Sequence, residues 1–101
     1  MKLNFDQVMI FSSIDKKQGE IKNIRKAFAN FIYTEESGIL ARAIANKIFN
    51  ATDETDFTPE ECFLIRQYCH DLTPNYIDAI EEMLDDAEAQ AEEQTDEKNN
   101  E

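Results

Sequence analysis

Apolar residues recur at intervals of three and four along most of the chain, which is the spacing of one face of a helix. This spacing predicts four helices, over about residues 20–33, 38–50, 59–71 and 74–93. A further segment, residues 4–14, is ambiguous, because its apolar positions fit a helix in part and an alternating strand in part. We expect a helix there, because no other segment of the chain offers a partner strand.

Two of these helices begin with the same signal, a Thr-Pro pair. Thr58 is placed to cap the first of them, and Glu61 completes a capping box while Pro59 takes the first helical position. Thr73 and Pro74 repeat the arrangement at the start of the next helix. Because so few residues lie between these two helices, we expect them to pack as a tight corner or hairpin.

The composition favours helices over strands. The chain has 101 residues, of which two are Gly and two are Pro, whereas an all-β fold needs many turns rich in these residues. We therefore predict an all-α fold, a compact bundle of four to five short helices within a domain of residues 1–87. Residues 88–101 are acidic and lack large apolar side chains, so we expect them to form a disordered tail.

Charge is distributed unevenly along the chain. Residues 1–50 carry eight Lys/Arg and five Asp/Glu, whereas residues 51–101 carry two Lys/Arg and seventeen Asp/Glu. A strongly negative half repels nucleic acid and anionic lipid and attracts basic surfaces, so the expected partner is a protein with a basic surface. The acids expected to contact it lie on the last two predicted helices: Glu60, Asp71, Asp78, Glu81, Glu82, Asp85 and Asp86.

Direct binding to nucleic acid or membrane is not expected. The basic residues of the segment 16–26 could contact phosphate, but Glu20 dilutes them and the net charge of −12 opposes approach to DNA. No run of about 18 apolar residues occurs, so we predict no membrane span. The apolar run after Lys2 is interrupted by Asp6 and does not resemble a secretory signal, so we expect a cytoplasmic protein.

The two cysteines fit a reducing compartment. Cys62 and Cys69 are seven residues apart in a predicted helix, which places their Cα atoms about 10.5 Å apart. A disulfide spans about 7 Å at most, so the two residues cannot bridge within the chain. We expect two buried, reduced cysteines.

Patterns that suggest catalysis or metal binding fail on inspection. The acidic loop 53–56 lacks the oxygen ligands and the glycine that a calcium loop needs further along. His70 lies between Cys69 and Asp71, but consecutive helical residues point about 100° apart, so the three side chains do not converge on one substrate atom. There is no glycine-rich phosphate loop and no serine elbow. We therefore expect no enzyme, no cofactor and no metal.

Two segments carry a resemblance to known proteins. The sequences NFIYTEESGILARAIANKIF and TPEECFLIRQYCHDLTPNYIDAI resemble small, acidic, helical proteins encoded by bacteriophages and mobile elements of gut bacteria. The resemblance implies an accessory role and transfers no functional residue.

The charge, the helical pattern and the lack of catalytic motifs together predict a non-enzymatic protein–protein interaction or assembly module. Self-association of the chain is also expected to be possible. The alternative is an acidic inhibitor that mimics DNA and occupies the site of a nucleic-acid-binding protein.

Overall fold

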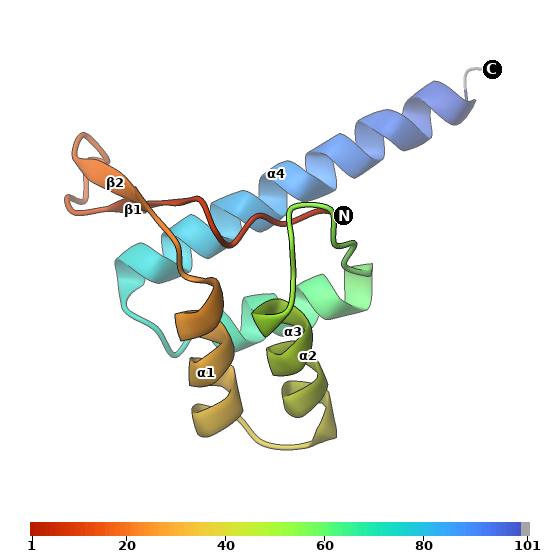
Figure 1. Ribbon diagram of the computed structural model, residues 1–101. Coiled ribbons are helices and arrows are strands. Elements are labelled where there is room, and N and C mark those ends of the chain that lie inside the picture. Colours follow the sequence, from red (N-terminus) through yellow and green to blue (C-terminus); the bar gives the residue numbers. More distant parts are fainter. Residues whose placement is uncertain (100–101) are drawn as a thin grey trace.

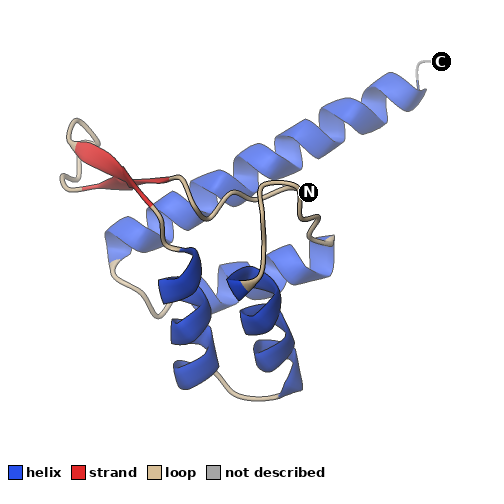
Figure 2. Cartoon of the chain, viewed as in Figure 1, coloured by secondary structure: helices blue, strands red, loops and turns tan. Residues whose placement is uncertain are grey.

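The computed structural model describes residues 1–99, and the side chains of residues 1–91. Over residues 1–99 the chain forms four helices and one two-stranded antiparallel sheet (Figure 1, Figure 2). The elements are β1 (Val8–Phe11), β2 (Gly19–Lys22), α1 (Arg25–Glu35), α2 (Ile39–Phe49), α3 (Pro59–Cys69) and α4 (Pro74–Asn99). The prediction of an all-α bundle is therefore wrong, although most of the chain is helical.

The first strand of the sheet, β1, lies in the ambiguous segment, residues 4–14. β1 pairs with β2 in a register that joins Val8 to Lys22 and Phe11 to Gly19. The connecting loop is held by Asp15, whose carboxylate accepts hydrogen bonds from the Ser13 hydroxyl at 2.8 Å and from the Lys17 backbone at 3.1 Å. The helix that we expected over residues 4–14 fails because a partner strand does exist, only a short loop away.

The partner strand, β2, overlaps the start of the helix that was expected over residues 20–33. That helix begins later, at Arg25, and Gly19–Lys22 forms β2 instead. All four residues of β2 are exposed, so the strand has no buried face and no apolar alternation to reveal it. The helices predicted at 38–50 and 59–71 are confirmed as α2 and α3, each within two residues of its predicted ends.

A cluster of aromatic rings joins the sheet to the helices. Phe5, just before β1, packs its ring 5.9 Å from that of Phe28 on α1 and 6.0 Å from that of Phe57 before α3. The Phe5 carbonyl also accepts a hydrogen bond of 2.9 Å from the backbone of Ile24. Phe5 and Phe57 are each 1 % exposed, so burial of these large rings ties the N-terminal segment to the helical part of the chain.

Helices α3 and α4 follow one another around the expected tight corner, and α4 extends past the other elements (Figure 1). Ile65 of α3 and Ile80 and Leu84 of α4 belong to the buried core. Cys62 and Cys69 are both buried and unbridged, as predicted.

The disordered tail expected from residue 88 is not found over residues 88–99, because α4 continues to Asn99. The sequence predicted that this helix ends near residue 93. Residues 100–101 of the predicted tail lie outside the described residues. The division into a domain and a tail stays a prediction. No helix of the described chain combines the length and the apolar composition needed to cross a membrane.

Candidate functional site

The starts of α3 and α4 fix the geometry on which the candidate site depends. At α3, the predicted capping box is confirmed, because the Thr58 hydroxyl accepts from the Glu61 backbone at 3.1 Å and the Glu61 carboxylate accepts from the Thr58 backbone at 2.8 Å. Lys47 of α2 also donates to Glu61 at 2.7 Å. Burial would raise the pKa of Glu61, but the bonds from Lys47 and Thr58 outweigh it, so this pKa is lowered.

The start of α4 is built differently and is anchored to the sheet. The Thr73 hydroxyl donates to Asn75 Oδ1 at 2.7 Å, and the Asn75 amide donates to the Phe11 carbonyl at 3.0 Å. The bond to Phe11 spans from the end of β1 to the first turn of α4. It therefore helps to hold β1 alongside α4.

The seven acids predicted to contact a partner lie on three different parts of the chain. Glu60 lies in the first turn of α3, and Asp71 lies in the connection after α3. The side chain of Asp71 forms a hydrogen bond with that of Glu36, and this bond, followed by burial and the negative charge of Asp71, raises the pKa of Glu36. Only the remaining five acids share one element, α4.

Two of these five acids face α3 and are already engaged. His70 Nε2 lies 2.9 Å from Glu81 Oε1, and Arg66 Nη2 lies 2.9 Å from Asp85 Oδ1. Arg66 also lies 3.5 Å from the carboxylate of Glu88. We call Glu81, Asp85 and Glu88 the paired face of α4. Because Arg66 of α3 and His70, which follows α3, already lie against this face, a basic partner gains little there.

The other three acids lie on a different stripe of the helix. Asp78, Glu82 and Asp86 follow one another at intervals of four residues, so they project from neighbouring positions on one side of α4, and all three are exposed. Among the described side chains, only Glu82 of the three has an ion pair, with Lys16 at 3.9 Å. We call Asp78, Glu82 and Asp86 the open face of α4.

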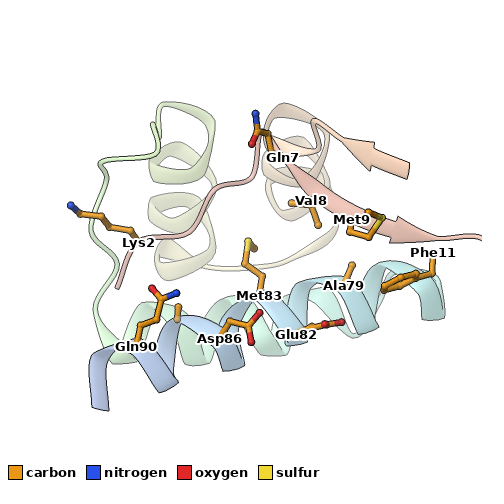
Figure 3. A pocket seen from close by; sticks show the side chains of 11 residues that line it. Lys2, Gln7, Val8, Met9, Phe11, Ala79, Glu82, Met83, Asp86 and Gln90 are labelled. Carbon is orange, nitrogen blue, oxygen red and sulfur yellow. The ribbon is translucent and has the colours of Figure 1, made fainter. Parts of the chain in front are cut away.

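The open face borders a cleft between α4 and the N-terminal part of the chain. The cleft has a volume of about 350 Å³ (Figure 3). Its apolar lining comes from both sides and includes Met9 of β1 and Met83 of α4, while Glu82 and Asp86 line it on the α4 side. Lys2 lies on the opposite side of the cleft, and its ammonium group is bound by Glu54 at 3.2 Å.

Such a cleft suits a side chain that is apolar along its stem and cationic at its end. A Lys or Arg stem would contact the two methionines, and its head would lie near Glu82 and Asp86. The sequence revealed the acids but not the methionines, because β1 meets α4 only through the fold. Met9 belonged to the segment for which we expected a helix.

A third group of side chains gathers where α3 ends. The ligand atoms of Cys69, His70 and Glu81 all lie within 4.8 Å of one another. The sequence had suggested Asp71 as the carboxylate beside Cys69 and His70, whereas the structure brings Glu81 across from α4. Burial, and then the charge of Glu81, raise the pKa of Cys69 to about 11, and its thiol donates to the Arg66 carbonyl at 3.1 Å. A protonated, fully buried thiol is a poor nucleophile at neutral pH.

Comparison with family models, with curated proteins and with solved structures finds no match to this chain. The resemblance to acidic helical proteins of phages therefore stays a prediction.

Proposed function

We propose that this protein is a non-enzymatic interaction module that binds a basic segment of a partner protein. The open face of α4 and its cleft are the proposed binding surface, and a Lys or Arg side chain of the partner enters the cleft. The observation that carries this proposal is the pair Glu82 and Asp86 beside an apolar lining that includes Met9 and Met83. Exposed carboxylates alone would attract any cation, whereas carboxylates beside an apolar cleft favour a cation on an aliphatic stem.

The two faces of α4 offer a matched test of this proposal. Glu82→Gln/Asp86→Asn removes two charges from the open face, and Glu81→Gln/Asp85→Asn removes the same two types of charge from the paired face. Because both double variants have the same net charge, a long-range electrostatic effect would weaken binding equally. A local effect at the cleft would weaken binding in the open-face variant more than in the paired-face variant.

The measurement is a fluorescence titration with a labelled lysine-rich peptide at low salt. We expect the open-face variant to lose about tenfold in affinity, because two ion contacts of roughly 0.5–1 kcal/mol each are lost. We expect the paired-face variant to stay within about twofold of the wild type, because Arg66 and His70 already oppose its acids. Equal losses in the two variants would contradict the proposal.

The alternative proposal, a DNA mimic, has one supporting observation. Mimicry needs charge on a rigid scaffold, and α4 is one continuous helix of 26 residues. A mimic would use acids along the whole helix. In a competition assay, the protein would then displace labelled DNA from a sequence-independent DNA-binding protein, and the two double variants would lose this activity equally. Displacement that is absent in the wild type would eliminate the alternative.

A further inference from the structure

A second surface, unrelated to α4, is the free edge of the sheet. The described sheet has two strands, so β2 is paired with β1 along one edge only. All four residues of β2 are exposed, and Ile21 is 65 % exposed. An exposed strand edge presents unpaired backbone N–H and C=O groups to any further strand.

The register of the hairpin shows which backbone groups face outward. The Ser12 backbone donates to the Gln18 carbonyl at 2.9 Å, just beyond the last strand pair. Hydrogen-bonded and non-hydrogen-bonded pairs alternate along an antiparallel ladder. Glu20 and Lys22 therefore direct their backbone groups toward β1, whereas Gly19 and Ile21 direct theirs toward the free edge.

We propose that the free edge of β2 pairs with β2 of a second copy of this chain, antiparallel and centred on Ile21. In this register, the outward N–H and C=O of Ile21 bond those of Ile21 in the second copy. Glu20 then lies opposite Lys22 of the second copy, and Lys22 lies opposite its Glu20. The backbone groups and the side-chain charges thus select the same register.

The side chains of the hairpin support this arrangement. Charged residues on an edge strand usually discourage pairing, because a random neighbour leaves them unmatched or opposite like charges. Within one chain, Lys22 Nζ lies 3.2 Å from Glu20 Oε1. In the dimer each of these residues also lies opposite the oppositely charged residue of the second copy, as a two-fold interface requires. Ile21, which is 65 % exposed, meets Ile21 of the second copy and adds an apolar cross-strand contact.

Charge exchange tests both the dimer and its register. Glu20→Lys places a lysine opposite Lys22 of the second copy, and Lys22→Glu places a glutamate opposite Glu20 of the second copy. Each variant alone should self-associate about tenfold more weakly than the wild type. An equal mixture of the two should recover association to within about twofold, because every cross-strand pair is then of opposite charge. This recovery also shows that both variants fold.

The measurement is sedimentation equilibrium of the full chain over rising concentration, with a monomer mass of 11.7 kDa. Glu35→Lys on α1 and Arg42→Glu on α2 serve as controls, because they change net charge by the same amounts at exposed positions away from β2 and should leave association unchanged. A wild type that stays monomeric at every concentration would overturn the proposal. A mixture that fails to recover, or controls that weaken association equally, would overturn it too. Peptide binding at the α4 cleft is measured separately, so failure of either proposal leaves the other standing.

Discussion

The paired face and the open face of α4 carry the same kinds of carboxylate, but different elements lie opposite them. Arg66 of α3 lies 2.9 Å from Asp85, and His70, just after α3, lies 2.9 Å from Glu81. Beside the open face, the nearest cation is that of Lys16, 3.9 Å from Glu82. Acidic residues one position apart on a helix therefore differ in availability, because availability depends on the neighbouring element and not on the number of acids.

The largest expected effect comes from disturbing the packing of α4 on the core, on which both faces of the helix depend. Leu84 is fully buried on α4, so Leu84→Ala leaves a cavity and should lower the free energy of unfolding by about 2–5 kcal/mol. Urea denaturation measures this loss. Phe63→Ala is the control, because Phe63 is 60 % exposed and its truncation should cost about 0.5 kcal/mol or less. Similar losses in the two variants would mean that α4 does not pack on the core as described.

A smaller effect concerns the thiol beneath the paired face. The pKa of Cys69 rises from its ordinary 9.0 to about 11 in the folded chain, chiefly through burial. A raised folded pKa adds stability below the unfolded pKa, and this stability is lost as pH rises through the folded pKa. The free energy of unfolding should therefore fall by about 2 kcal/mol between pH 9 and pH 11 on account of this group.

Cys69→Ala provides the comparison for this pH dependence. The variant is less stable overall, but its free energy of unfolding should fall less steeply over the same pH range, because the titrating thiol is gone. Parallel pH profiles for the variant and the wild type would contradict the burial of Cys69. The profiles are measured by denaturation at each pH.

The smallest expected effect comes from a substitution that removes the partner of the paired face. Arg66→Gln removes the cation beside Asp85 and Glu88 and should cost about 1 kcal/mol or less, because these pairs are partly exposed. This substitution is most informative when it is combined with the paired-face double variant. In the Arg66→Gln background, Glu81→Gln/Asp85→Asn should now weaken binding of the lysine-rich peptide by at least about twofold. An unchanged affinity would mean that Arg66 is not what neutralises this face.

The parts of the fold that could be predicted are those encoded locally. The capping box at Thr58 and Glu61 needs four consecutive residues, and it places the start of α3 correctly. The apolar periodicity over residues 38–50 likewise predicts both ends of α2 to within one residue. At α4, Thr73 resembles a second cap, but its hydroxyl donates to Asn75 Oδ1, and this oxygen accepts from the Tyr76 backbone at 3.1 Å.

The parts that could not be predicted depend on contacts between distant segments. β2 is four residues long and exposed throughout, so its pairing with β1 leaves no pattern in the sequence. The acids of the candidate site were visible, but their division into two faces depends on how α3 packs against α4. The cleft depends on β1 lying beside α4, which the helix expected over residues 4–14 would not have allowed.

The most direct test of the central claim uses the three methionines as internal probes. Met9 and Met83 line the cleft, whereas Met1 lies beside the Cys62 thiol, with the two sulfur atoms 3.8 Å apart. We would record methyl NMR spectra of methionine-labelled protein during titration with the lysine-rich peptide. We expect the Met9 and Met83 methyl signals to shift together and saturably, and the Met1 signal to stay unchanged. Glu82→Gln/Asp86→Asn should suppress the shifts. Binding that leaves Met9 and Met83 unmoved would contradict the cleft as the binding site.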